Sequence, residues 1–217
     1  TKGMTGASHF LEHMMFEGSK MFAKGEFSKM IEDQGGSTNA YTTYDQTVYY
    51  EHMPIESLET IIEAEADRMQ NLLMDPKEFL REKQVVLEER KMRYENSPHG
   101  QLRLLAMSHL FKGTPYETPV IGSVKDIKSV TRDQVYEYFK KYYSPNNATL
   151  VLVGDFEPNR VINLIVDKFG NIPPSKEIEA EKAQASQKDH ESEYKLRGRI
   201  SKVDAYYGQS KNPLFFM

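Results

Sequence analysis

Apolar residues recur at helical spacing through most of this chain. From Pro54 to about Met74 they fall three or four positions apart, which places them on one face of a helix. Proline opens several such segments and glycine closes others, as at Gly35-Gly36. Thr131 and Gln134 have the spacing of a capping box. The helices predicted in this way cover residues 8–15, 24–34, 54–74, 76–95, 101–111, 131–143 and 158–169, and Thr5 or Ser8 is expected to cap the first.

Two other segments have the composition of strands. Residues 37–52 are rich in β-branched and aromatic side chains and predict one or two strands bent near Asp45. Residues 148–153 form a short apolar run closed by Gly154, which predicts a buried strand. Helices combined with a few antiparallel strands indicate an α+β fold in which helices pack on an antiparallel sheet.

The pattern changes after Pro174. Residues 175–193 are rich in Glu, Lys, Gln and Ser and predict a charged, solvated linker. Residues 194–217 have strand-like stretches without a clear period. We therefore expect one domain over residues 1–174, a linker over 175–193, and an unassigned tail or the start of a second unit over 194–217.

Composition excludes several classes of protein. The chain has 217 residues, with 28 Lys and Arg against 32 Asp and Glu, and its net charge of −4 argues against a nucleic-acid partner. No run approaches the roughly 18–20 apolar residues of a membrane span, so none is expected. The absence of cysteine excludes disulfides, a thiolate metal site and a cysteine nucleophile. Catalytic or metal chemistry must therefore use His, carboxylates, hydroxyls or amines.

The most informative segment is His9-Phe10-Leu11-Glu12-His13. On a helix, His9 and His13 lie one turn and about 40° apart, so that both imidazoles can bind one ion. Glu12 borders the same face, where it can accept a proton from water activated by zinc. This order, HxxEH, is a zinc peptidase motif. The alternative is that two structural histidines lie by chance near an unrelated glutamate.

A third ligand is expected from the predicted helix 76–95. Glu88 lies on a polar face, whereas Glu89 lies between Val85 and Val86 on a partly apolar face, where a buried carboxylate needs a partner. Glu82 is seven residues earlier and nearly in line with Glu89. Glu89 is therefore the candidate ligand. The alternative is that both acids pair with cations of the same helix, namely Lys83, Arg90 or Arg93.

Several motifs between Gly6 and Pro174 resemble one family in both sequence and order. They are HFLEHMMFEGS, GGSTNAYTTYDQTVYY, EAEADRM, EKQVVLEERKMRYENSP, YYSPNNATLVLVGDFEP and FGNIPP. Together they are similar to the pitrilysin/insulinase family of zinc metallopeptidases, the inverzincins. The likeness is greatest to its smaller bacterial members, which are similar to mitochondrial processing peptidase.

This resemblance implies roles for particular residues. His9, His13 and Glu89 match the three protein ligands of one Zn²⁺ ion per catalytic half, and Glu12 matches the general base. Glu82 matches a further acid that supports the site. The segment Asn39-Ala40-Tyr41 matches the edge strand that holds extended substrate, and an edge strand can pair with a peptide through its free N–H and C=O groups. Without the resemblance, an ordinary internal hairpin would be the expected structure of that segment.

The resemblance also implies an architecture. The active enzyme would be a clamshell of two similar halves, of which this chain would be one, with a complementary half in the same or a separate chain as a homo- or heterodimer. The first strands of that half precede the motif in the family, and here eight residues precede His9, so these strands are expected to be missing. His52, His99, His109 and His190 match no metal spacing.

The predicted function is therefore that of a zinc-dependent endopeptidase. It would hydrolyse short or unfolded polypeptides, using water activated by zinc and Glu12, and the chain alone could be inactive without its complementary half. The alternatives are a non-catalytic partner or structural subunit of the same fold, and a module that binds metal without catalysis. A bacterial protein is expected, in the periplasm or the cytoplasm, with the periplasm favoured.

Overall fold

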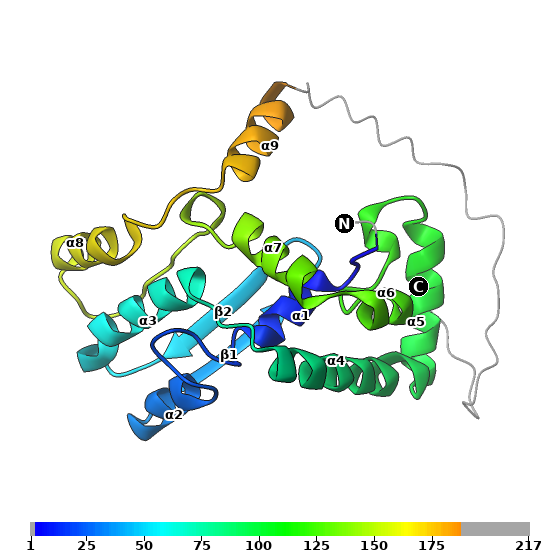
Figure 1. Cartoon of the computed structure of the whole chain (residues 1–217), viewed down its shortest axis with the longest axis horizontal. Coiled ribbons are helices and arrows are strands. Elements are labelled where there is room, and N and C mark those ends of the chain that lie inside the picture. The colour runs from blue at the N-terminus through cyan, green and yellow to red at the C-terminus, as the bar shows by residue number, and fades with distance from the viewer. Residues whose placement is uncertain (1–2, 188–217) are drawn as a thin grey trace.

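The computed structural model describes residues 3–187, which form helices around one small sheet (Figure 1). Single-turn 3₁₀ segments and one π-type turn at Lys91–Glu95 connect some of these elements. Within this span, no helix combines the length and the apolar character needed to cross a membrane. The elements are α1 (Ala7–Met14), α2 (Glu26–Asp33), β1 (Ser37–Thr42), β2 (Thr47–His52), α3 (Leu58–Gln70), α4 (Pro76–Arg90), α5 (Pro98–Leu110), α6 (Val124–Ser129), α7 (Arg132–Tyr142), α8 (Pro158–Phe169) and α9 (Lys176–Gln187).

The sheet is an antiparallel hairpin of β1 and β2. Its register runs from Ser37 opposite His52 to Thr42 opposite Thr47, and the turn 43–46 joins the strands. Burial alternates along β1, so that one face of the strand is turned to solvent and the other to the protein, where α1 packs. The hairpin confirms the strands expected over residues 37–52, and the helices around it confirm the α+β fold class.

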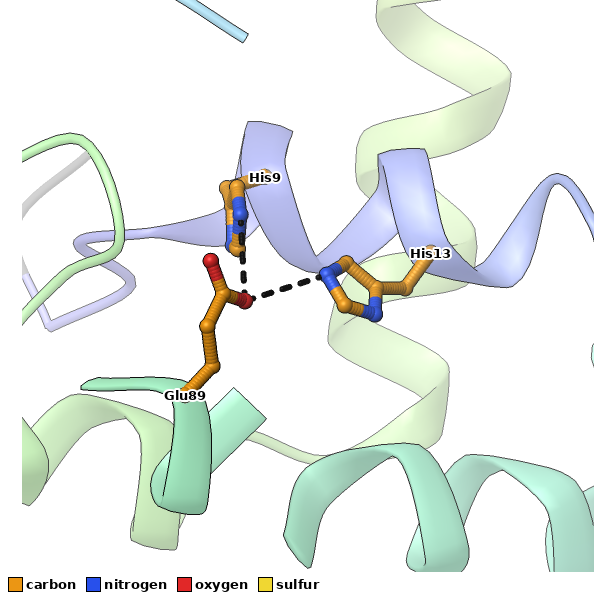
Figure 2. A group of neighbouring side chains, drawn as sticks. All are labelled: His9, His13 and Glu89. Carbon is orange, nitrogen blue, oxygen red and sulfur yellow. Dashed lines mark ion pairs between the residues drawn. The ribbon is translucent and has the colours of Figure 1, made fainter. Parts of the chain in front are cut away.

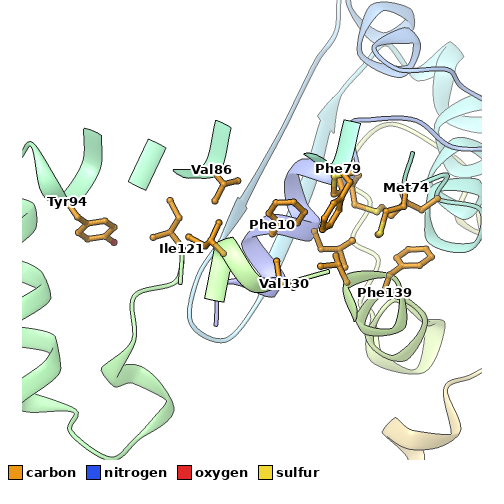
Figure 3. Close-up of a cluster of buried hydrophobic side chains, with 14 residues drawn as sticks. Phe10, Met74, Phe79, Val86, Tyr94, Ile121, Val130 and Phe139 are labelled. Atoms are coloured by element: carbon orange, nitrogen blue, oxygen red, sulfur yellow. The ribbon is translucent and has the colours of Figure 1, made fainter. Parts of the chain in front are cut away.

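The helix α1 lies at the centre of the main hydrophobic core. It packs against α4, α7 and both strands, and its Phe10, Leu11 and Met14 are almost completely buried. Figure 3 shows Phe10 beside Phe79 of α4, with their ring centroids 5.0 Å apart, and Val86 of the same helix in the cluster. Each large apolar side chain buried here contributes about 1.5–3 kcal/mol. Because this face of α1 is fixed in the core, the direction of its polar face is fixed as well.

Most predicted helices are present, with shifted ends. Thr131 and Gln134 form the expected capping box at the start of α7. The first helix is preceded by Gly6, at φ 85°, rather than capped by Thr5 or Ser8. Gly6 is required there, because a Cβ would lie 2.3 Å from the Ile121 carbonyl oxygen.

Two helices differ more clearly from prediction. Helix α5 begins at Pro98, three residues before the expected start, and the Ser97 side chain caps it by accepting from the Gly100 N–H. Helix α6 lies in a segment predicted to be a loop, where the Ser123 side chain accepts from the Asp126 N–H. With six residues, α6 is too short to show a hydrophobic period. Its N-cap residue Ser123 was therefore the only signal of this helix in the sequence.

The predicted strand over residues 148–153 is wrong. These residues form no strand, and Val151 and Val153 are 74% and 94% exposed. No strand in residues 3–187 pairs with them. Apolar composition indicates a propensity for strand, but a strand also needs a neighbour for its N–H and C=O groups.

The charged segment expected to be a linker over residues 175–193 is helical in its first part, because Lys176–Gln187 form α9. Its Ile178 is buried, and the helix packs against α7. Glu, Lys, Gln and Ala favour helices as well as solvated linkers, so composition did not separate the two. The rest of the predicted linker and residues 194–217 lie outside the described residues.

Candidate metal centre

Two histidines of α1 lie side by side at the edge of the core. His9 and His13 are one helical turn apart, and their ring centroids are separated by 4.9 Å. His9 is buried and His13 is half-buried. Burial of the opposite face of α1 directs both rings toward α4, as the i, i+4 spacing requires.

Helix α4 brings a carboxylate to this pair. Glu89 Oε2 lies 3.5 Å from His9 Nε2 and 3.4 Å from His13 Nε2. Figure 2 shows both imidazoles pointing toward this carboxylate across the space between α1 and α4. One donor atom from each of the three residues lies within 4.8 Å of the other two. The structure therefore brings together the three predicted ligands, although His13 and Glu89 are 76 positions apart in the sequence.

The donor set fits a zinc ion. Glu89 Oε2 and His9 Nδ1 are buried atoms with no hydrogen-bond partner among residues 3–187. Buried polar atoms without partners are costly, and a cation would satisfy the carboxylate oxygen. Ligands about 2.1 Å from a tetrahedral zinc lie about 3.4 Å from one another, which agrees with both histidine–carboxylate distances. Two imidazole nitrogens and one carboxylate oxygen are also a known catalytic zinc set.

The charges at this centre shift its pKa values in opposite directions. Burial alone would lower the pKa of His13, but the neighbouring carboxylates of Glu89 and Glu82 raise it above its ordinary value. Burial alone would raise the pKa of Glu89, but electrostatic interactions with the adjacent His13 and His9 imidazoles hold it well below its usual range. Glu89 is therefore held as a carboxylate, which is the form that binds metal.

Glu82 contacts the ring nitrogen of His13 that does not face Glu89. It is buried, and its Oε2 lies 3.1 Å from His13 Nδ1. Arg81 Nη2 donates to the other carboxylate oxygen at 2.7 Å. An ionised Glu82 can only accept, so it selects the tautomer with the proton on Nδ1 and leaves His13 Nε2 free to face Glu89.

Glu12 lies next to the ligands but is not one of the three that converge. Its half-buried side chain accepts a hydrogen bond at Oε2 from the hydroxyl of Thr42, the last residue of β1. Sequence reasoning missed this partner, because nothing in the local pattern links positions 30 residues apart.

The segment Asn39-Ala40-Tyr41 lies in the middle of β1. Within residues 3–187 the sheet has two strands, so one edge of β1 is not paired with another strand. Asn39 and Tyr41 are exposed, and the Ala40 N–H donates to Asn39 Oδ1 at 2.8 Å. A peptide that paired at Ala40 would replace this local bond. Among the described residues this edge of β1 is free, and the role of the segment in holding substrate stays a prediction.

The alternative for Glu82 and Glu89 was pairing with Lys83, Arg90 or Arg93, and only one such pair is present among the described residues. Arg93 Nη2 contacts Glu89 Oε1 at 2.8 Å, whereas the histidine contacts are to Oε2, and Glu82 pairs with Arg81. Arg90 and Lys83 instead donate to backbone carbonyls.

The remaining histidines divide into two groups. Among the described residues, His52, His99 and His109 belong to no cluster that could hold a metal. His190 lies outside these residues. None of these four histidines was predicted to bind metal.

Two family models match the sequence. Residues 1–124 match the model described as Insulinase (Peptidase family M16), and residues 129–209 match the one described as Peptidase M16 inactive domain. All eight candidate site residues lie within the first match, because the last of them is Glu89.

Individual proteins show the same likeness. The chain is 35% identical to the zinc protease PqqE of Helicobacter pylori, covering 79% of this chain and 39% of that protein. A solved protease from Helicobacter pylori superposes with a TM-score of 0.76 at 34% identity, covering 80% of this chain and 42% of that one. The first half of the periplasmic protease PqqL from Escherichia coli gives a TM-score of 0.71 at 25% identity, covering 80% and 38%. The chain thus spans about two fifths of the length of these relatives.

Proposed function

Because this chain belongs to the insulinase family of zinc proteases (peptidase family M16), as its motifs predicted, we propose that it is the metal-binding half of a zinc endopeptidase. In this proposal residues 1–174 form the catalytic half. His9, His13 and Glu89 bind one Zn²⁺ ion, and Glu12 is the general base. The substrates are short or unfolded polypeptides.

One observation carries the proposal most directly. Three donor atoms from α1 and α4 converge, and the carboxylate oxygen at their centre has no hydrogen-bond partner within the described part of the chain. A purely structural histidine pair would be expected to use its hydrogen bonds within the protein. Here Glu82 takes Nδ1 of His13 and leaves Nε2 to face Glu89.

The chemistry follows from these positions. Zinc bound in such a site polarises a carbonyl and lowers the pKa of water toward neutrality. Glu12 adjoins His13 in the sequence and can accept the proton of the attacking water, then return it to the leaving amine. Glu82 holds the His13 ring, and Arg93 contacts Oε1 of Glu89, the oxygen not in contact with the histidines. These two residues act by positioning the ligands.

The free edge of β1 supports the proposed substrate class. An extended peptide can add to this edge through main-chain hydrogen bonds, which depend little on side-chain identity. Pairing of this kind requires the substrate to be unfolded or short. Asn39, Ala40 and Tyr41 would make the contacts, and Asn39 would first release the Ala40 N–H.

The complementary half is part of the proposal. The solved relative from Escherichia coli is described as the first half of its protease, and this chain covers about two fifths of each relative. A second half, in the same or another chain, would enclose the substrate. That relative is periplasmic, which supports the periplasm as the compartment of this protein.

A non-catalytic subunit of the same fold is the second candidate. The match of residues 129–209 to a domain described as inactive favours it. All the proposed ligands and Glu12 nevertheless lie within residues 1–124, outside that match. The retained donor set supports the enzyme over the structural subunit.

The test combines metal analysis with peptide cleavage. We expect one zinc per chain, and chelator-sensitive cleavage of a quenched, unstructured peptide when the chain is assayed with its complementary half. Glu12→Gln should retain zinc and lower kcat by about 10²–10⁴-fold, because the base is lost. Glu88→Gln, at an exposed acid of α4, is the matched control and should change neither. Zinc binding without any cleavage by the wild type would favour the non-catalytic subunit.

A further inference from the structure

The last residue of β1 connects the free-edge strand to Glu12. Thr42 is half-buried, and its hydroxyl donates to Glu12 Oε2. It lies directly after Asn39-Ala40-Tyr41, on the face of β1 that packs toward α1. In the part of the chain that the structure describes, no other hydrogen bond to the Glu12 side chain is present.

A second hydroxyl fixes the direction of this bond. Thr47 Oγ1 lies 3.2 Å from Thr42 Oγ1, across the last pair of the hairpin. A threonine hydroxyl has one proton, and an ionised carboxylate can only accept. Since Thr42 gives its proton to Glu12, Thr47 must donate to Thr42. The chain of bonds therefore runs from β2 through β1 to α1, and each donor polarises the next.

We propose that Thr42 is a positioning residue that sets the orientation of Glu12 and aligns it with a peptide paired on β1. This inference rests on the proposed function, because it assigns Glu12 as the base and β1 as the substrate strand. The hydrogen bonds of the Thr42 side chain go to Glu12 and Thr47, not to the proposed ligands. It acts by holding one oxygen of Glu12.

The physical reason is the freedom of a glutamate side chain. Glu12 has three side-chain torsions, and its carboxylate rotates readily about the last of them. A hydrogen bond to Oε2 restricts that rotation and leaves Oε1 to meet the water. The same bond connects Glu12 to β1. The position of Glu12 is therefore fixed relative to a substrate peptide paired on that strand. Misplacement of a catalytic group by about 1 Å can cost about 100-fold in rate.

The test compares three variants of β1 in the chain assayed with its complementary half. Thr42→Val removes the hydroxyl and keeps the shape, Thr42→Ser keeps the hydroxyl, and Thr38→Val is the control. Thr38 lies on the same face of the same strand and also donates to a carboxylate, that of Glu51 at 3.3 Å, away from the metal centre. We expect Thr42→Val to lower kcat by about 10–100-fold, the range seen when a supporting partner is lost.

KM and zinc content should not change in Thr42→Val, because substrate pairing and the ligands are untouched. Thr42→Ser should restore kcat, and Thr38→Val should leave it at the wild-type value. An unchanged kcat in Thr42→Val, beside an active and chelator-sensitive wild type, overturns this inference and leaves the proposed function standing. A zinc-loaded wild type that cleaves nothing overturns the proposed function instead.

A second readout does not depend on activity. With ¹³C-labelled glutamate, the Glu12 carboxyl signal can be identified by its loss in Glu12→Gln. Thr42→Val should displace this signal in the metal-free chain, and Thr42→Ser and Thr38→Val should not. A Glu12 signal identical in Thr42→Val and the wild type would refute the hydrogen bond on which the inference depends. If Thr42→Val does not fold, Thr42→Ala removes the same hydroxyl with less bulk.

Discussion

The metal centre and a second buried group, the arginine cluster, both place charges against α1, but they satisfy those charges in different ways. The arginine cluster consists of Arg68 of α3, Glu51 of β2, Glu65 of α3 and the rings of Phe16, Phe27 and Tyr49. The metal centre gathers nitrogen and carboxylate donors around one another. The arginine cluster supplies its own cation.

Arg68 is 1% exposed and joins three elements. Its Nε donates to the carbonyl oxygen of Met15 at the end of α1, its Nη1 donates to Glu65, and the same atom lies 3.7 Å from Glu51. The guanidinium carbon lies 4.3 Å from the centroid of the Phe27 ring. This cation therefore has both acids and aromatic faces as partners, although its Nη2 atom is buried without a hydrogen-bond partner among the described residues.

The difference separates structure from function. In the arginine cluster, Glu51 and Glu65 already face a protein cation in the folded chain. This pairing contributes to the stability and geometry of the fold. At the metal centre, Glu89 Oε2 faces two imidazoles and has no hydrogen-bond partner among the described residues. Two imidazole nitrogens and a carboxylate oxygen in this arrangement form a donor set that a bound metal cation would complete.

The largest effect is expected from removing the cation of the arginine cluster. Arg68→Met leaves Glu51 and Glu65 buried without it, so we expect the free energy of unfolding to fall by about 3–5 kcal/mol. Chemical denaturation measures this change. Arg160→Met is the control, because Arg160 is 80% exposed and 3.8 Å from Glu59, and should change stability by about 0.5 kcal/mol or less. Equal effects in the two variants would remove the distinction drawn above.

A change at the metal centre should affect metal binding more than folding. Glu89→Gln removes the charged ligand, and we expect zinc affinity to fall by about 100-fold or more, beyond the 10–100-fold typical of a lost supporting residue. Competition with a chromogenic chelator measures it. Glu88→Gln, one position away and exposed on the polar face, should bind zinc like the wild type. If both variants lose zinc equally, the assignment of the ligand face is wrong.

The acids of the two groups should also differ in their dependence on pH. Burial and the charge of Glu65 raise the pKa of Glu51 to about 7 from 4.5, against the opposing effect of Arg68. A raised pKa means that the folded protein binds this proton more tightly than the unfolded chain does. The contribution of Glu51 to stability is therefore most favourable below about pH 4.5 and is lost as pH rises through about 7.

Glu51→Gln should make this dependence visible. From about pH 5 to about pH 8, the wild type should lose about 1–3 kcal/mol of stability relative to the variant, which cannot ionise at this position. Denaturation of both proteins at several pH values gives the difference. A difference that does not vary with pH would mean that Glu51 stays ionised throughout, fully paired with Arg68.

Much of the candidate site was predictable, because it depends on local periodicity. The spacing of His9 and His13 predicted their common face, and the apolar neighbours of Glu89 separated it from Glu88. Both arguments need only the geometry of a single helix. The contact of Thr42 with Glu12 and the burial of Arg68 depend on how distant elements pack, which no single-helix pattern contains.

The errors in the fold have the same origin. Residues 148–153 were expected to be buried because they are apolar, and residues 175–193 were expected to be a linker because they are polar. In the structure, the polar segment itself forms α9, which packs against α7 and buries Ile178, and no strand among the described residues covers the apolar one. Burial depends on a partner surface, which composition does not specify.

The smallest effect tests this last distinction. Val153 is 94% exposed and Val86 is fully buried beside Phe10, although both are valines in apolar runs. Val153→Ala should change the free energy of unfolding by about 0.5 kcal/mol or less, as for other surface substitutions. Val86→Ala removes two buried carbon atoms and should cost more than about 1.5 kcal/mol. If Val153→Ala destabilises the chain as much as Val86→Ala, residues 148–153 are covered in solution, and the strand predicted from the sequence would have to be reconsidered.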